Sequence, residues 1–217
     1  MEISDKIIDR LTLYHCIFTD YSEKKIEYIS SPQIANLLKI DDSQVRKDLK
    51  YLNNIGKCRV GYNVLELKQS IERTLGFEVR KGAFIVGAGH LGLALSKYDN
   101  FLSYGLDIKA LFDINPEKIN TQIGEKKVFN LNDLPKMAKE MNVEMAILTV
   151  PRTSAQNVTD FLVASGINNI WNFAPCILRV PENTKVWNEN LMSSCLQFRA
   201  HTQNEKKISK QEECKMK

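Results

Sequence analysis

Residues 83–98 read AFIVGAGHLGLALSKY, an apolar run followed by a glycine-rich turn and a helical segment. Gly87, Gly89 and Gly92 form the pattern G-x-G-x-x-G. The first glycine permits a tight turn, the second lets the backbone approach a pyrophosphate, and the third lets the helix pack closely on the sheet. The pattern alone is weak evidence, but its place between a strand and a helix predicts a Rossmann-type dinucleotide-binding domain.

A second predicted strand, IKALFD at residues 108–113, ends in a carboxylate. Asp113 lies 21 residues after Gly92, close to the spacing of the acid that accepts hydrogen bonds from the adenosine ribose hydroxyls. Because the same carboxylate repels a 2′-phosphate, the sequence favours NAD(H), as NADH or NAD+, over NADP(H). The alternative is a Rossmann-like domain that kept its turn but binds another nucleotide or none.

Two more apolar runs predict strands, EMAILTV at 144–150 and NIWNF at 169–173, with a helix between them. Nearly continuous apolar strands separated by helices are typical of a parallel sheet covered on both faces. Ligands bind beyond the carboxyl ends of such strands, so the turns after these runs are expected beside the cofactor. The cofactor-binding residues predicted in this way are Gly87, Ala88, Gly89, His90, Leu91, Gly92, Asp113, Thr149, Val150, Pro151, Asn172, Phe173 and Ala174. In the alternative interpretation Phe173 and Pro175 only shape a turn.

Before residue 70 the pattern is that of two short helices joined by a polar turn. Ser31 is expected to cap the first helix, with Pro32 at its first position. Asp41 and Asp42 are expected to open the second helix, SQVRKDLKYLNN, whose apolar side chains share one face. A helix pair of this kind, with a cationic outer face on its second member, is typical of a helix-turn-helix. The predicted DNA-binding residues of the second helix are Ser43, Gln44, Arg46, Lys47 and Lys50.

The following stretch, KCRVGYNVLEL at 57–67, reads as a short strand pair, the wing of a winged helix. It adds Lys57, Arg59 and Tyr62 to the predicted DNA-binding residues. Between Ser43 and Tyr62 there are five cations and one acid, so this segment carries as much net charge, +4, as the whole chain. Such clustering is expected for phosphate contact. The alternative is a solvated amphipathic helix in a protein-binding winged helix.

The composition of the 217-residue chain narrows the class of protein further. Hydrophobic residues make up 43% and charged residues 26%, which is typical of a globular protein. The apolar runs are far shorter than the ~20 residues that cross a bilayer, and the first residues do not resemble a secretory signal. The five cysteines are odd in number and scattered, so we expect no disulfide framework, no metal site and a cytoplasmic location.

Several segments together resemble the Rex family of bacterial redox-sensing transcriptional repressors. They follow one another in the family's order and extend to about residue 198. They are RLTLY (10–14), SQVRKDLKYL (43–52), GYNV (61–64), VGAGHLGLAL (86–95), FDINPEKI (112–119), AILTVP (146–151) and NFAPCILRVP (172–181).

The resemblance implies an α/β homodimer with an N-terminal winged helix-turn-helix domain, a Rossmann-type parallel-sheet domain and a C-terminal dimer-exchanged helix. We place these at residues 1–76, 77–187 and 188–217, the last including a polar tail. Family members bind palindromic, double-stranded operator DNA and are released by NADH when the NADH/NAD+ ratio rises. Leu191, Cys195 and Phe198 share one face of the helix that is expected to reach the partner.

The resemblance also assigns single residues. Arg46, Lys47 and Lys50 are expected in or beside the major groove, and Lys57 and Tyr62 in the wing near the minor groove. Tyr98 is expected to approach the nicotinamide end of the cofactor, in a pocket that includes Pro151, Phe173 and Ala174. Packing in the core is an equal alternative for Tyr98.

Three departures from the family pattern concern the DNA-binding wing and the dimer. The family usually has Arg-Gly where this chain has Cys58 and Arg59, and the loss of that glycine removes conformational freedom from the wing. It usually has an arginine at Cys16 and an aspartate at Asn190, two residues associated with an ionic contact that helps to switch the dimer. A divergent Rex-like paralogue with weak or altered DNA binding therefore remains an alternative.

An NAD-dependent oxidoreductase is a further alternative, because a dinucleotide site permits hydride transfer. That chemistry needs an acid or base near the nicotinamide. The histidines, His15, His90 and His201, do not follow a late strand of the predicted sheet, and no sizeable substrate domain is present. We therefore expect no enzymatic activity.

Overall fold

The computed structural model describes residues 3–52, 60–200 and 202. The chain forms two compact units, one of Met1–Arg80 with Asn100–Leu106, the other of Lys81–Asp99 with Asp107–Lys217. The sequence pattern does not indicate that Asn100–Leu106 belongs to the first unit. The domain boundaries predicted from the sequence stay predictions. Among the helices of the described ranges, none is both long and apolar enough to span a bilayer.

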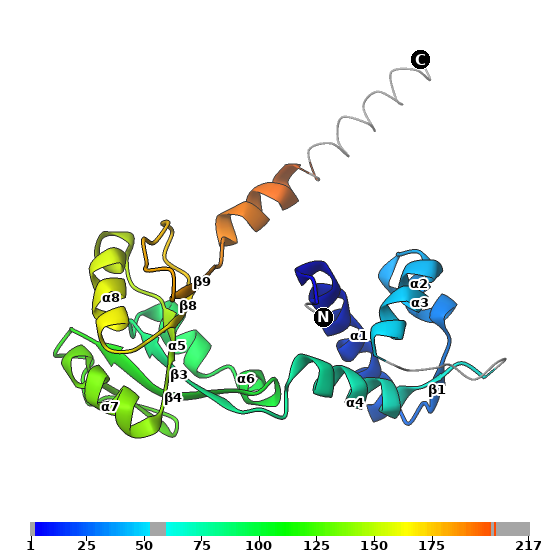
Figure 1. The fold of residues 1–217 in the computed structure, drawn as a ribbon, viewed down its shortest axis with the longest axis horizontal. Helices are drawn as coiled ribbons and strands as arrows, with labels where there is room; N and C mark the ends of the chain where they lie inside the picture. The colour runs from blue at the N-terminus through cyan, green and yellow to red at the C-terminus, as the bar shows by residue number, and fades with distance from the viewer. Residues whose placement is uncertain (1–2, 53–59, 201, 203–217) are drawn as a thin grey trace, which may run out of the picture. The chain divides into compact units, whose positions relative to one another are not determined.

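The first unit is helical, with a two-stranded antiparallel sheet. Fully buried side chains from several of its helices, among them Tyr14, Phe18, Leu49 and Ile71, form one core. Its elements are α1 (Asp5–Glu23), β1 (Tyr28–Ile29), α2 (Ser31–Leu38), α3 (Asp42–Tyr51), β2 (Tyr62–Asn63), α4 (Val64–Leu75) and α6 (Asn100–Ser103), drawn in Figure 1. Helices α2 and α3 are the predicted helix pair, and Asp41 caps α3 as expected by accepting a hydrogen bond from the Ser43 N–H.

The predicted cap of α2 at Ser31 is wrong, because Ser30 holds that position. The Ser30 hydroxyl accepts the Gln33 N–H at 3.4 Å, and the Gln33 Oε1 accepts the Ser30 N–H at 2.8 Å. This reciprocal pair is a capping box and requires the serine three residues before the glutamine. Ser31 is therefore the first helical residue, and it is buried.

The predicted strand pair over residues 57–67 is wrong in its second half. Asn63 Oδ1 accepts the Glu66 N–H at 3.0 Å and so begins helix α4 at Val64. The strand before it, β2, pairs with β1. Residues 53–59 lie outside the described ranges.

The second unit is a seven-stranded sheet with helices. Its elements are β3 (Lys81–Val86), α5 (His90–Ser96), β4 (Leu106–Asp113), β5 (Gln122–Ile123), β6 (Lys126–Asn130), a short 3-10 helix (Leu131–Asp133), α7 (Leu134–Met141), β7 (Met145–Leu148), α8 (Arg152–Ala164), β8 (Asn169–Asn172) and β9 (Lys185–Asn188). The strand order is β5-β6-β4-β3-β7-β8-β9. Apart from the antiparallel edge strand β5, this is the doubly wound Rossmann order, which confirms the predicted fold.

Both faces of the central strands are covered. On one face Phe84, Phe112 and Leu148 pack against α7 and α8, which lie together on that side of the sheet (Figure 1). Ile85 and Leu111 alternate with them along β3 and β4, point the other way and are also fully buried. The apolar runs that predicted these strands are continuous for this reason.

Residues 191–200 continue as a helix after β9. Asn190 caps its start, because its Oδ1 accepts the Ser193 N–H at 3.0 Å. Leu191 and Phe198 are 59% and 72% exposed, and Cys195 is exposed too. An exposed apolar face of this kind is typical of a surface that binds another chain.

Candidate functional site

The glycine turn lies between β3 and α5, at the carboxyl end of the central strand. Gly87 has φ of +104°, which favours glycine, and its N–H donates to the Phe112 carbonyl at 2.8 Å. A Cβ atom at Gly92 would lie 2.0 Å from the Gly87 oxygen, so the third glycine is required for close packing of the helix. A Cβ atom at Gly89 would meet nothing within 4 Å, so the backbone there is open to a ligand.

Thr149, which follows β7, holds the turn from the neighbouring strand. Its hydroxyl donates to the Gly87 carbonyl at 2.7 Å, and its N–H donates to the Val86 carbonyl at 2.9 Å. The crevice between β3 and β7 is the place where the strand order reverses, and ligands of doubly wound sheets bind at such a point.

Asp113 ends β4 with a side chain that is 10% exposed and accepts hydrogen bonds on both carboxylate oxygens. Oδ2 accepts the Ala88 N–H of the glycine turn at 2.8 Å and the Lys118 Nζ at 3.2 Å, and Oδ1 accepts the Asn115 N–H at 2.9 Å. Burial opposes ionisation, but these hydrogen bonds and the charge of Lys118 outweigh it and lower the pKa of Asp113. The carboxylate is therefore ionised and oriented at neutral pH, ready to accept hydroxyl donors.

A cavity of about 570 Å³ opens between the turn, Asp113 and the start of α8. Eight of the predicted cofactor-binding residues line it: Gly87, Gly89, Leu91, Asp113, Thr149, Val150, Pro151 and Phe173. Sequence reasoning missed the other seven lining residues, which are Val86, Phe112, Ile114, Lys118, Leu131, Ser154 and Val158. Among these residues only Lys118 is charged. Its place in the segment NPEK (115–118), directly after Asp113 and Ile114, is the sequence signal that could have indicated it.

The other predicted cofactor residues do not line this cavity. Ala88 acts through its N–H on Asp113. His90 is exposed at the start of α5, and Tyr98, 52% exposed, follows the end of that helix; neither lines the cavity. A contact of either residue with the cofactor stays a prediction.

Asn172 is buried at the end of β8 and organises the loop that follows. Its amide donates to the Cys176 carbonyl at 3.0 Å and to Asn188 Oδ1 at 2.8 Å, while its Oδ1 accepts the Ala174 N–H at 2.9 Å. The structure thus gives Asn172 and Ala174 a loop-shaping position, and their predicted contact with a cofactor stays a prediction.

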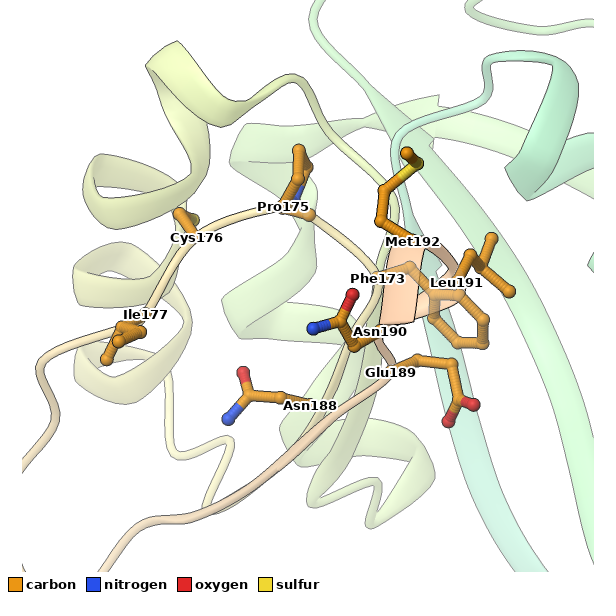
Figure 2. Close-up of a pocket in the computed structure, with 10 residues that line it drawn as sticks. Phe173, Pro175, Cys176, Ile177, Asn188, Glu189, Asn190, Leu191 and Met192 are labelled. Atoms are coloured by element: carbon orange, nitrogen blue, oxygen red, sulfur yellow. The ribbon is translucent and has the colours of Figure 1, made fainter. Parts of the chain in front are cut away.

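A second cavity, of about 550 Å³, continues the row of strand ends beyond β8. Figure 2 shows it between the loop after β8, with Cys176 and Ile177, and the residues from the end of β9 onward, with Asn188 and Asn190. Phe173 lines both cavities.

The predicted DNA-binding residues of α3 fall into two groups. Arg46, Lys47 and Lys50 are exposed; Arg46 is paired with Asp42 at 2.6 Å, and no ion pair to Lys47 or Lys50 occurs within the described residues. Ser43 is also exposed, whereas the Gln44 amide donates inward to Asp48 at 2.8 Å.

Asp48 is the buried anchor of α3, with 1% of its side chain exposed. Arg10 of α1 binds it through two nitrogens, Nε at 2.6 Å and Nη2 at 2.9 Å, and the Tyr14 hydroxyl donates to it at 2.8 Å. The network fixes α3 against α1, and the orientation of the cationic face follows from it. No periodicity in the sequence indicates this contact, because the partners lie 38 and 34 positions apart.

Tyr62 lies in β2, half-buried, and packs in part against the core of the first unit. Lys57 and Arg59, the other wing residues predicted to bind DNA, lie outside the described residues. No group of three or more metal-ligating side chains was found within the described ranges.

Two family models match the sequence. One is described as a CoA binding domain and matches residues 80–176, and the other is described as a putative DNA-binding protein N-terminus and matches residues 2–50. The first model covers the glycine turn, and the second covers α2 and most of α3.

Similar proteins cover nearly the whole chain. The redox-sensing transcriptional repressor Rex of Clostridioides difficile is 38% identical over 192 residues, 88% of this chain and 91% of its own length. The protein of the same name from Treponema denticola is 42% identical over 86% of this chain and 89% of its own length. Two crystal structures of RSP, each 30% identical to this chain, are similar to its fold. The complex with β-NAD+ and operator DNA has a TM-score of 0.86 and covers 97% of this chain and 97% of RSP. The complex with β-NADH has a TM-score of 0.85 and covers 97% of this chain and 99% of RSP.

Proposed function

Because the chain belongs to the Rex family of redox-sensing transcriptional repressors, we propose that it binds operator DNA as a homodimer and leaves it when NADH is bound. The observation that carries this proposal is the presence, in one chain, of an open glycine turn with an oriented carboxylate and of a helix-turn-helix with exposed cations. The proposal is supported by RSP, which has been crystallised with NADH and with NAD+ together with operator DNA.

The residues present fit a dinucleotide. The absence of any atom within 4 Å of a Cβ at Gly89 leaves room for a pyrophosphate, and Asp113 is positioned to accept the hydroxyls of the adenosine ribose. Bound NADH or NAD+ supplies the redox state that the repressor senses. Val150 and Phe173, which line the same cavity, would give the nicotinamide an apolar surface.

The apolar surface gives a reason to prefer the reduced ring. NAD+ carries a positive charge on its nicotinamide, and burying an unpaired charge is costly, whereas the reduced ring is neutral. A titration of the operator-bound chain with NADH, and separately with NAD+, tests the proposal. We expect NADH to lower DNA affinity by roughly 5–150-fold, the usual range of allosteric coupling, and NAD+ to lower it less. Equal effects of the two ligands would contradict the redox function.

The relatives are named as transcription regulators, and we propose that this chain regulates without catalysing a reaction. We also propose that residues 191–200 pair with a second copy through Leu191, Cys195 and Phe198. Steady oxidation of NADH by a small carbonyl compound, measured by the loss of absorbance, would overturn the first of these proposals.

The exposed lysines of α3 should account for much of the DNA affinity. We expect Lys47→Ala/Lys50→Ala to weaken operator binding about tenfold or more and to reduce the salt slope by about 2, because each phosphate contact releases counterions. Fluorescence anisotropy with a labelled operator at several salt concentrations measures both quantities. As the matched control, Lys6→Ala/Lys24→Ala removes one exposed charge in the first turn of α1 and one directly after its end, and should leave the slope unchanged. Equal slopes for both double variants would place the DNA elsewhere.

A further inference from the structure

Lys118 is a charged residue of the dinucleotide cavity that the proposed binding site does not yet use. It lies five residues after Asp113, lines the same cavity, and places its Nζ 3.2 Å from Asp113 Oδ2. Its side chain is 40% exposed, so the ammonium group remains accessible to a ligand. No other lysine or arginine lines this cavity among the described residues.

The turn that carries Lys118 is fixed by its own hydrogen bonds. Asn115 accepts the Glu117 N–H through Oδ1 at 3.0 Å and the Lys118 N–H through its carbonyl at 3.0 Å. The Thr121 hydroxyl donates to the Lys118 carbonyl at 2.7 Å. Because Asn115 also donates its N–H to Asp113, one short turn determines the positions of both charges.

The two charges have opposite effects on a phosphate at the ribose 2′ position. Under the proposed function the Asp113 carboxylate accepts the ribose hydroxyls, and its negative charge would repel a phosphate there. Lys118 contacts that carboxylate on the same oxygen as the Ala88 N–H, so its positive charge lies at the same end of the cavity. A 2′-phosphate brings a charge of about −1.5 to −2 at neutral pH and would attract the ammonium group strongly.

We propose that Lys118 is a specificity-determining residue: it offsets the charge of Asp113 and is available to pair with a 2′-phosphate, so that NADPH is a weaker second ligand of the cavity. NADH remains preferred, because the carboxylate still accepts its ribose hydroxyls. The inference rests on the proposed function, since it concerns the same cavity and the same class of ligand.

The test compares the affinities of NADH and NADPH for the full-length chain by isothermal titration calorimetry. Lys118→Met should lower NADPH affinity about tenfold or more, the range of a charge-assisted hydrogen bond at a partly exposed site, and change NADH affinity less than about threefold. Lys118→Arg should retain NADPH binding. As the matched control, Lys136→Met removes an exposed lysine of α7 that does not line the cavity and should alter neither affinity. Thermal unfolding checks that each variant is folded.

Asp113→Asn provides an independent variant. With the carboxylate neutralised, the unopposed Lys118 should strengthen NADPH binding relative to NADH about tenfold, and Lys118→Met should remove that gain in the double variant. Equal losses of NADH and NADPH affinity in Lys118→Met would overturn the proposal, as would binding of NADH without any NADPH binding by the wild-type chain. Failure of the wild-type chain to bind either dinucleotide would instead contradict the proposed function.

Discussion

A Gly92→Ala substitution is expected to destabilise the Rossmann unit by about 3 kcal/mol and to abolish NADH binding, because it forces apart the packed turn of the nucleotide site. An alanine Cβ at this position would lie 2.0 Å from the Gly87 carbonyl oxygen and 2.8 Å from the Thr149 hydroxyl. The nearest atom belongs to the backbone, so no side-chain rotation relieves the overlap. Either α5 must move away from β3 or the turn must change its conformation. Chemical denaturation and calorimetry with NADH measure the two effects.

Gly89→Ala is the matched control, since it adds the same methyl group three residues earlier. A Cβ there meets nothing within 4 Å, and the backbone φ of −81° suits alanine. The stability should fall by about 1 kcal/mol, less than for Gly92→Ala, because the added methyl group meets no atom and the remaining cost is that of alanine being a poor N-cap. NADH affinity should still fall, since the methyl group occupies the open side of the turn. Wild-type stability of Gly92→Ala, or equal destabilisation by both substitutions, would contradict this account of the two glycines.

The Rossmann half could be predicted from the sequence because its evidence is local. The strand, the glycine turn and the start of α5 follow one another along the chain, and Asp113 stands at the expected spacing. The structure confirms the tight turn at Gly87 and the close packing at Gly92. The short strands β5 and β9 had no such signal, since an edge strand does not need a continuous apolar run.

The helices and strands of the first unit are harder to predict from the sequence. Their ends depend on side-chain caps and on contacts between residues far apart in the chain. Ser30 and Ser31 are equivalent in local composition, and only the reciprocal bond with Gln33 distinguishes them. Val64 begins a helix rather than continuing a strand because Asn63 caps it. Short apolar stretches do not separate helix from strand by periodicity alone.

In the candidate sites, too, contacts between side chains could not be predicted from the local sequence. Asp48 is the single acid between Ser43 and Tyr62, and the net charge of +4 for that segment includes it. In the structure it is buried on Arg10, so it does not face outward with Lys47 and Lys50. The sequence does not predict Lys118 as a residue of the cavity, because a sequence pattern does not give its side-chain distance from Asp113.

An Asp48→Ala substitution is expected to cost about 3–5 kcal/mol of unfolding free energy, the usual effect of removing one partner of a buried ion pair. Three side chains donate to the carboxylate, and alanine would leave Arg10 and the Tyr14 hydroxyl without their acceptor. Chemical denaturation measures the loss. Asp20→Ala removes an exposed carboxylate from α1 and should change the stability by less than about 0.5 kcal/mol.

The Asp48 carboxylate should make the unfolding free energy of the first unit fall at acidic pH. Burial opposes ionisation of Asp48, but the hydrogen bonds from Arg10, Tyr14 and Gln44 outweigh it and lower its pKa. The folded pKa therefore lies below the unfolded value of about 3.9, so the carboxylate stabilises the fold above that pH and loses its contribution as the pH falls through the folded pKa. Unfolding free energies of wild type and Asp48→Asn, compared between neutral pH and about pH 3, should converge on acidification. A difference that stays constant over this range would show that the charge of Asp48 does not stabilise the α1–α3 contact.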